Sequence, residues 1–265
     1  MASSNDSISK TIIVAVALCL VCSIFVAGAA VGLKPIQQEN RDLDRKRNIL
    51  AAAQMLQPGE SVEEVFATVE KRLVNIEAGR FATDAELQEA GINVDSYSQQ
   101  AAAKDPALST SLKGESDPAS IKRRAKFAAV YVVKDENAKA RIILPVHGYG
   151  LWSTMYGFMA LESDLSTVVG FGFYQQAETP GLGGEVDNPN WKALWEGKEV
   201  YNEEGEAVIR LAKGSVDSND PNASHKVDGL SGATLTSRGV TNLVQYWLGS
   251  EGFGPFLAEL RSEGV

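Results

Sequence analysis

Residues 11–33, TIIVAVALCLVCSIFVAGAAVGL, contain no charged side chain. At 1.5 Å per residue, a helix of this length measures about 35 Å, which is enough to cross the hydrocarbon core of a bilayer. We interpret the run as one transmembrane helix after a short tail, residues 1–10. A cleaved secretory signal is the alternative, because Ala27-Gly28-Ala29 resembles a small-residue cleavage site. The single basic residue ahead of the run and the apolar residues beyond that site favour retention.

The charge around this run predicts an orientation. Five basic residues follow it, Lys34, Arg41, Arg45, Lys46 and Arg47, against Lys10 and the amino terminus before it. By the positive-inside rule alone, the rest of the chain faces the cytoplasm.

Composition excludes two classes of function. The net charge of −9 and the pI near 4.9 argue against nucleic-acid binding, which depends on clustered Lys and Arg. Both cysteines, Cys19 and Cys22, lie in the apolar run, so the rest of the chain has no thiol for disulfides or iron–sulfur clusters. The two histidines, His147 and His225, are too far apart to indicate a local metal pair, and no metal site is predicted. Redox chemistry in the soluble part therefore requires a cofactor.

Residues 34–120 are predicted to be a helical stalk or scaffold. The sequence RKRNILAAAQML (45–56) favours a helix, and Ser61 with Glu64 has the capping-box spacing for a second helix over 61–79. Apolar residues recur there at helical spacing. The segment 96–119, rich in Ser, Ala, Gln and Asp, is expected to be a loose connection.

Residues 121–265 have a different pattern, which predicts a sheet domain. Strands are expected at 127–133 and 140–146, joined as a hairpin by KDENAK, and at 154–161, 167–174 and 206–211. Asn188-Pro189 predicts a helix start, and a terminal amphipathic helix presents Val240, Leu243, Val244 and Trp247 on one face before a last helix from about Gly254. Strands and helices are segregated, so the fold class is α+β: a transmembrane helix followed by a mainly antiparallel sheet domain flanked by helices.

Three segments of this half are candidates for chemistry. Small residues and hydroxyls crowd the start of the amphipathic helix over 225–237, which suits a phosphate because free N–H groups and the helix dipole favour an anion. Plain N-capping by Ser231, Thr234 or Thr236 is the alternative, and local physics leaves the choice open. The other two segments are ETPGLGG (178–184) and HGYGLW (147–152). As alternatives to a functional role, the Pro-Gly turn of the first is an ordinary β-turn and the aromatic residues of the second belong to the core.

The segment Asp228-Gly-Leu-Ser-Gly-Ala-Thr234 resembles the D-G-x-S/T-G-A-T signature of proteins that a flavin transferase modifies. The resemblance implies that Thr234 receives FMN as a phosphodiester. Thr234 is assigned rather than Thr236 because the acidic position lies six residues earlier. By the same resemblance the transferase recognises Asp228, Ser231, Gly232 and Ala233, and Leu235 and Thr236 lie beside the cofactor.

ETPGLG is the second hallmark of the same FMN-binding family, and it comes in the expected order about fifty residues earlier. The resemblance implies that this segment lines the isoalloxazine site, and that two residues of GLWSTMYGF cover one face of the ring. The lining residues implied are Glu178, Thr179, Gly181, Leu182 and Gly183, and the covering residues are Leu151 and Trp152. Gln176 departs from the histidine of many relatives, which leaves an imidazole role there unsupported.

The resemblance spans nearly the whole chain and is greatest to the family of C-type subunits of the sodium-translocating NADH:quinone reductases. It implies an electron-transfer subunit with covalent FMN in a complex that couples NADH oxidation and quinone reduction to Na⁺ export. Lacking a nicotinamide motif, the chain alone is not expected to oxidise NADH. The implied partners are the FMN-carrying B-type subunit, the D-type and E-type membrane subunits, and the flavin transferase.

The same resemblance implies a single-pass protein of the bacterial inner membrane with its flavin domain on the periplasmic side, against the local charge bias. Two alternatives to the C-type family stay open. One is the related G-type subunit of the ion-translocating ferredoxin:NAD oxidoreductase. The other is an anchored binding module without a cofactor, in which both motifs are structural turns.

Overall fold

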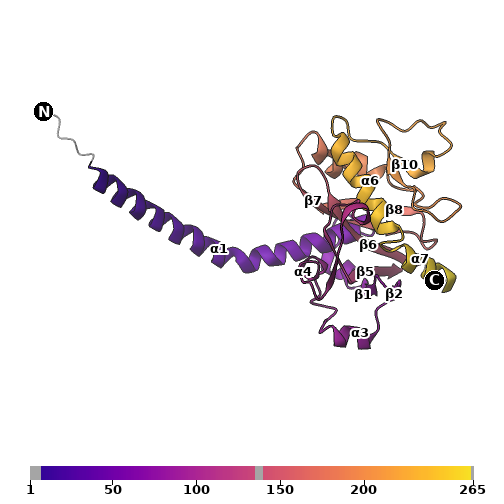
Figure 1. Cartoon of the computed structure of the whole chain (residues 1–265), viewed down its shortest axis with the longest axis horizontal. Coiled ribbons are helices and arrows are strands. Elements are labelled where there is room, and N and C mark those ends of the chain that lie inside the picture. Colours follow the sequence, from indigo (N-terminus) through magenta and orange to yellow (C-terminus); the bar gives the residue numbers. More distant parts are fainter. Residues whose placement is uncertain (1–6, 135–139, 264–265) are drawn as a thin grey trace. The chain divides into compact units, whose positions relative to one another are not determined.

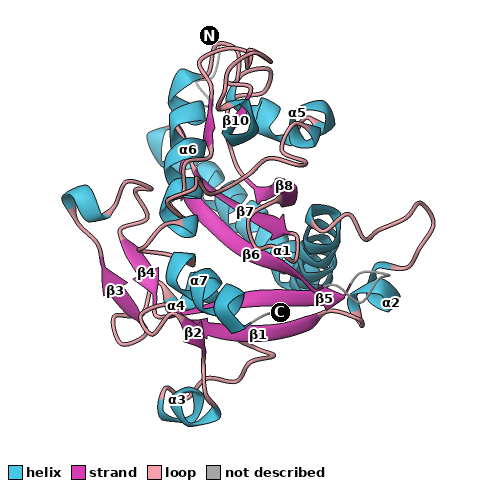
Figure 2. Cartoon of the chain, turned by 90° about the vertical axis from the view of Figure 1, so that its right-hand side faces the viewer, coloured by secondary structure: helices cyan, strands magenta, loops and turns pink. Residues whose placement is uncertain are grey.

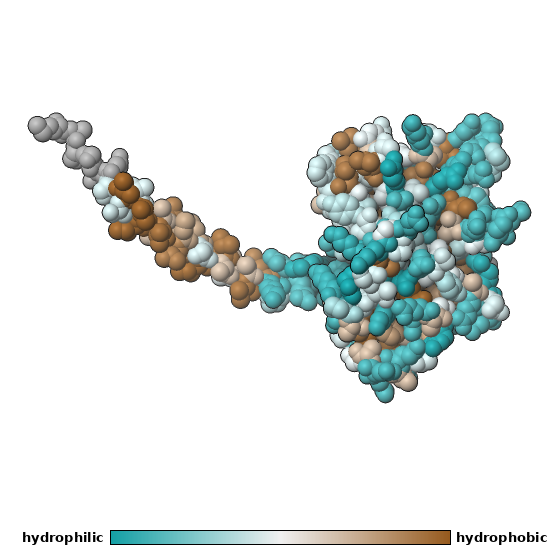
Figure 3. All heavy atoms as spheres, viewed as in Figure 1, coloured by the Kyte–Doolittle hydropathy of each residue, from teal (hydrophilic) through white to brown (hydrophobic). Residues whose placement is uncertain are grey.

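The predicted membrane span lies inside one long helix, α1 (Ile8–Ala52), which continues through Pro35. The computed structural model describes residues 7–134 and 140–263 (Figure 1). Within them, α1 is the one helix long and apolar enough to cross a membrane, and Figure 3 shows apolar side chains along its N-terminal part. The chain divides into two compact units, Met1–Asp44 and Arg45–Val265.

The end of α1 belongs to the second unit. The Met55 N–H donates to the Leu50 carbonyl at 2.9 Å and the Gln54 N–H to the Ala51 carbonyl at 3.1 Å. This pair of hydrogen bonds, with Gln54 at φ +54°, is a Schellman termination. The Gln54 side chain then donates to the Val169 carbonyl at 2.8 Å, so the helix end is fixed to the sheet.

The main sheet of the described residues has six strands in the order β2-β1-β5-β6-β7-β8, and every neighbouring pair is antiparallel (Figure 2). The strands are β1 (Glu70–Asn75), β2 (Arg80–Phe81), β5 (Phe127–Lys134), β6 (Ala140–Tyr149), β7 (Thr154–Leu161) and β8 (Val168–Gln175). Lys134 pairs with Ala140, which confirms the predicted hairpin. The rest of its KDENAK turn lies outside the described residues.

Both faces of this sheet are covered, as strand β6 shows. Ile142, Leu144 and Val146 belong to the core cluster that includes the C-terminal helices, whereas Ile143 packs with Ile49 of α1 on the opposite face. Side chains alternate between the faces of a strand, so a strand buried on both sides is a nearly continuous apolar run. This explains why these strands were predictable from the sequence.

The helix predicted over 61–79 is wrong beyond its first turn. Ser61 does cap a helix, α2, but α2 covers only Val62–Phe66, and β1 begins at Glu70. Leu73 and Val74 of β1 are both buried, and the strand pairs with β5 over its full length. The apolar spacing there fits both the helical and the strand period, and pairing with the neighbouring strand β5 favours the strand.

The segment expected to be a loose connection contains short regular elements. They are α4 (Gln99–Ala102), β3 (Ser109–Ser111) and the 3₁₀ turn η1 (Gly114–Ser116). Helix α3 (Asp84–Glu89) lies before the segment and strand β4 (Arg123–Ala125) after it. Strand β3 pairs antiparallel with β4, so part of this segment is an ordered ribbon.

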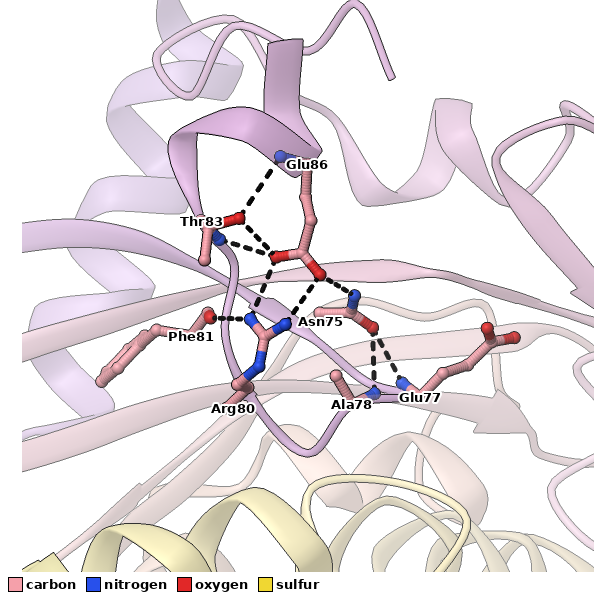
Figure 4. Close-up of polar contacts among 7 residues, drawn as sticks. All are labelled: Asn75, Glu77, Ala78, Arg80, Phe81, Thr83 and Glu86. Carbon is pink, nitrogen blue, oxygen red and sulfur yellow. Dashed lines mark hydrogen bonds and ion pairs between the residues drawn. The ribbon is translucent and has the colours of Figure 1, made fainter. Parts of the chain in front are cut away.

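A capping box begins α3, and it joins a larger polar cluster (Figure 4). The Glu86 carboxylate accepts two bonds from the Arg80 guanidinium, each 3.0 Å, and others from the Thr83 N–H and hydroxyl and from Asn75. The bonds from Arg80, then those from Thr83, lower the pKa of Glu86 to about 2. This cluster fixes the β1–β2 hairpin to α3.

The last hundred residues supply the helices that cover one face of the sheet. The elements are η2 (Gly183–Asp187), α5 (Pro189–Ala193), β9 (Arg210–Leu211), η3 (Ala223–His225), β10 (Lys226–Val227), α6 (Thr234–Leu248) and α7 (Gly254–Glu263). The predicted Asn188 cap, the buried face of α6 and the last helix are confirmed. The strand predicted over 206–211 is limited to β9, which pairs in parallel with β10. The fold class is α+β, as predicted.

Candidate functional site

The two loops that carry the predicted flavin motifs lie directly against each other. A Cβ atom added to Gly183 would lie 2.6 Å from the Thr236 hydroxyl, and one added to Gly232 would lie 2.9 Å from the Leu182 side chain. Gly232 also has φ +70°, a conformation that favours glycine. The glycines of both motifs therefore allow the loop after β8 to contact the start of α6.

A buried carboxylate ties the third predicted segment to these two. Glu178 is 4% exposed. It accepts hydrogen bonds of 3.0 to 3.1 Å from the N–H groups of Leu151, Trp152 and Ser153, and one of 2.7 Å from the Thr236 hydroxyl. The Ser153 hydroxyl is a further donor at 3.3 Å. One side chain thus holds the β6–β7 turn, the ETPGLGG loop and helix α6 together.

The environment of Glu178 favours its charged form. Burial alone would raise the pKa of this carboxyl, but the hydrogen bonds from the three N–H groups and from Thr236 hold the pKa below its usual range. The resemblance implied that Glu178 lines the flavin site. In the structure its carboxylate is buried and positions the exposed residues Leu151 and Trp152.

The two candidate threonines have opposite environments. Thr234 is the first residue of α6 and is exposed, whereas Thr236 is 1% exposed and its hydroxyl donates to Glu178. The N-cap position belongs to Ala233, which is buried and provides no side-chain cap. Capping by Ser231, Thr234 or Thr236 is thus not what begins this helix. Its first N–H groups have no capping side chain, and an exposed hydroxyl lies beside them.

Exposed apolar side chains lie on the segments around the start of α6, including Leu235 directly after Thr234. Leu151, Trp152, Leu182 and Leu235 are 36%, 66%, 43% and 51% exposed, respectively. They come from the β6–β7 turn, the ETPGLGG loop and the start of α6, the three segments that Glu178 joins. We call these four residues the apolar rim. Exposed apolar residues gathered around a polar anchor are typical of a site for a flat ring.

The remaining predicted residues have supporting or surface positions. Thr179 and Gly181 are exposed in the loop, as is Ser231 before α6. Asp228 accepts from the Val216 N–H at 2.8 Å, so its carboxylate holds the loop before β10. Gln176 donates to Asp187 at 2.6 Å and accepts from the Glu178 N–H at 2.6 Å. Gln176 therefore stabilises the ETPGLGG loop in the position where a histidine was expected.

The aromatic residues of HGYGLW divide between core and surface. The strand predicted over 140–146 extends to Tyr149, so His147 lies in β6, where it is buried and stacked on Tyr156 with ring centroids 5.2 Å apart. Burial lowers the pKa of its imidazole to about 4, so His147 is neutral at pH 7. Only the residues after Gly148 reach the surface, where Trp152 belongs to the apolar rim.

Two basic residues near Thr234 were missed in the sequence. Lys213 and Arg238 line a groove of about 280 Å³ that also includes Thr234. Arg238 had a visible signal, because it lies one helical turn after Thr234. Lys213 lies in a loop before β10 and no local pattern indicates it. The described residues contain no group of acidic, histidine or cysteine side chains that could hold a metal ion.

These features define the class of the protein. Residues 150–249, which include the apolar rim, the Glu178 carboxylate and Thr234, match the FMN-binding domain family. The residues present fit this cofactor, since they provide an apolar surface for a ring, an exposed hydroxyl and cations for a phosphate.

Similarity over the whole chain identifies the family within this class. The chain is 53% identical over 262 residues to the C-type subunit of the Na(+)-translocating NADH-quinone reductase of Pseudomonas aeruginosa, covering 97% of this chain and 98% of that protein. It is 48% identical over 262 residues to the C-type subunit of Vibrio alginolyticus, covering 98% of each. The chain belongs to the family of C-type subunits of the Na(+)-translocating NADH-quinone reductases.

Solved structures agree with this assignment. The crystal structure of Shewanella oneidensis NqrC covers 85% of this chain and 99% of its own, with 37% identity and a TM-score of 0.74. The crystal structure of the C-type subunit from Parabacteroides distasonis covers 85% of this chain and 96% of its own, with 25% identity and a TM-score of 0.64. The predicted resemblance to the C-type family is confirmed.

Proposed function

We propose that this protein is an electron-transfer subunit that carries FMN, joined by a phosphodiester to Thr234, in a membrane complex that couples NADH oxidation and quinone reduction to Na⁺ export. The contrast between the two threonines carries the proposal. Thr234 is exposed beside the apolar rim, whereas Thr236 is buried and donates to Glu178. Of these two hydroxyls, an enzyme that modifies this segment can reach only the first.

FMN supplies the redox chemistry when it is bound, and the protein holds and positions it. The apolar rim gives the ring a surface and excludes water from it. Glu178 fixes the three segments of the rim, and Asp228 and Gln176 fix the loops beside them. A covalent bond suits a relay cofactor, which must neither dissociate nor shift between partners.

The location that we propose follows the family rather than the local charge. Residues 11–33 form the membrane span. The FMN-binding domain, predicted over 121–265, lies on the periplasmic side of the inner membrane together with residues 45–120, which contribute β1 and β2 to the same sheet. The partners are the B-type, D-type and E-type subunits and the flavin transferase. Large domains and partner subunits can outweigh the local charge bias after the span. A protease-accessibility assay on spheroplasts tests the orientation, and protection of the domain would contradict it.

A matched pair of variants tests the covalent site. Full-length protein co-expressed with a competent flavin transferase should give a flavin-fluorescent band after denaturing electrophoresis. Thr234→Val should lose this band and Thr236→Val should keep it, with folding of both checked by circular dichroism. Unlabelled wild-type protein, or a label that persists in Thr234→Val, would contradict the proposal. The anchored binding module without a cofactor predicts the first of these results.

A further inference from the structure

The groove beside Thr234 has a distinctive lining. It lies between helix α6 and the loops before and after β10, and its volume is about 280 Å³. The lining residues are Leu211, Ala212, Lys213, Gly214, Gly229, Leu230, Thr234, Ser237, Arg238 and Thr241. They include two cations and no carboxylate, in a protein with a net charge of −9.

Both cations are available to a ligand. Within the described residues, neither the Lys213 ammonium nor the Arg238 guanidinium has an ion-pair partner. Some other cations of the domain do have one, as Arg141 has in Glu162 at 3.1 Å. An unpaired cation on a surface is common by itself. Here two of them share one groove with the hydroxyl that the proposed function assigns to the cofactor.

The register of α6 places Arg238 on the same side as Thr234. Residues three and four apart are neighbours on a helix, and the groove takes residues 234, 237, 238 and 241 from α6. Thr236 lies on another side and contacts Glu178. Arg238 can therefore reach toward a group on the Thr234 oxygen without displacing the residues that Glu178 holds.

We propose that Lys213 and Arg238 bind the phosphodiester anion of the flavin attached to Thr234. This inference rests on the proposed function, which places FMN there. A phosphodiester carries one negative charge. Hydrogen bonds that it accepts from a guanidinium or an ammonium are stronger than those from neutral donors. The start of α6 adds the favourable end of a helix dipole. The apolar rim then holds the ring while the two cations fix the phosphate.

The loading reaction is balanced without a redox partner. With flavin adenine dinucleotide as donor, Thr234 Oγ forms a bond to the FMN-side phosphorus and the pyrophosphate P–O bond breaks. AMP leaves with that oxygen, and the hydroxyl proton passes to solvent. Negative charge on the transferred phosphoryl group would be stabilised by the same two cations during this step.

The test compares full-length charge variants under one loading assay. Lys213→Gln, Arg238→Gln and the double variant are incubated with flavin transferase and flavin adenine dinucleotide, with Lys104→Gln as the matched control because Lys104 is exposed outside the groove. Each groove variant should label about tenfold more slowly than the wild type. Added salt should slow the wild type more than the double variant. In the labelled products, the ³¹P resonance should move in the double variant and not in Lys104→Gln.

Each other result overturns the inference in a distinguishable way. Wild-type labelling of the double variant, while Thr234 is still required, would remove the role of the groove and leave the proposed function standing. Slow labelling with an unchanged ³¹P resonance would show that the two cations help the transferase to bind and do not bind the phosphodiester. Wild-type protein without covalent flavin would overturn both proposals.

Discussion

Two glutamates, Glu86 and Glu178, each gather several hydrogen-bond donors, but they do so in opposite ways. Glu86 faces a cation, Arg80, and its side chain is 27% exposed. Its donors all come from residues 75–86. Glu178 is 4% exposed and its donors are neutral groups from residues 151–153 and from Thr236, 58 residues away. The first glutamate stabilises a local turn, and the second assembles a site.

The difference teaches where this protein depends on burial. A carboxylate near water exchanges protein donors for solvent donors at small cost, whereas a buried one leaves unsatisfied partners when it is removed. Because Glu178 and its donors belong to three separate segments, losing it should affect all three. Four experiments test this difference between the two glutamates. They are given in order of the expected loss of stability, from the largest, at Glu178, to the smallest, at Glu86.

Replacing Glu178 with alanine should have the largest effect. The change leaves three N–H groups and the Thr236 hydroxyl without their acceptor, so the free energy of unfolding should fall by about 4 kcal/mol. Chemical denaturation measures this, and hydrogen exchange at 151–153 should rise. Glu178→Gln keeps the side-chain volume and one acceptor oxygen, so the free energy of unfolding should fall by roughly half as much as in Glu178→Ala. Equal losses for Glu178→Ala and Glu86→Ala would contradict the comparison.

Acid should weaken the packing around His147 before it weakens the Glu86 cluster. The pKa of His147 is about 4 when folded and 6.5 when free, so the folded state binds fewer protons between these values. Its stabilising contribution is complete above pH 6.5 and is lost as the pH falls toward 4, on the order of 3 kcal/mol in total. Denaturation at pH 7.5 and at pH 4.5 measures it. His147→Gln should reduce the pH dependence of the free energy of unfolding. An unchanged pH dependence in this variant would show that another group causes it.

Adding one methyl group at the loop contact should have a moderate effect. Gly183→Ala places a Cβ 2.6 Å from the Thr236 hydroxyl and 3.0 Å from the Glu178 Cβ, so the loop must move away from α6. We expect a loss of about 2 kcal/mol and weaker flavin labelling. Gly172→Ala is the control, because its Cβ would meet Lys192 at an ordinary 3.5 Å. Two equally stable variants would show that this contact is not tight.

The smallest effect is expected at the Glu86 cluster. Glu86→Gln removes the charge opposite Arg80 but keeps a side chain that can accept hydrogen bonds, so it should lower stability less than Glu178→Gln does. Hydrogen exchange should rise locally in α3, and flavin labelling should stay as in the wild type. Since the pKa of Glu86 is about 2 and its ordinary value 4.5, the contribution of its charge is present above pH 4.5 and is lost below it. A loss of labelling in Glu86→Gln would contradict the separation of the two clusters.

The accuracy of the sequence predictions follows the same contrast between local and distant contacts. The bounds of strand β7 were predicted correctly, and so were the four buried residues of α6. Both predictions depend on apolar periodicity, which is visible in residues close together in the chain. The segment 70–75 was predicted as helix and is a strand, because its apolar spacing fits both periods and only the pairing with β5 distinguishes them. The Thr83 and Glu86 capping box is a local signal that was overlooked.

The sequence by itself determined the apolar run, the α+β class and the six-residue spacing from Asp228 to Thr234, on which the prediction of Thr234 rests. These depend on composition and on residues close together in the chain. Only the tertiary structure decided that Thr236 is buried against Glu178, that Glu178 supports the site from beneath, and that Lys213 and Arg238 share a groove with Thr234. Such arrangements join segments that are distant in sequence, and their energies come from burial and from satisfied donors that no local pattern records.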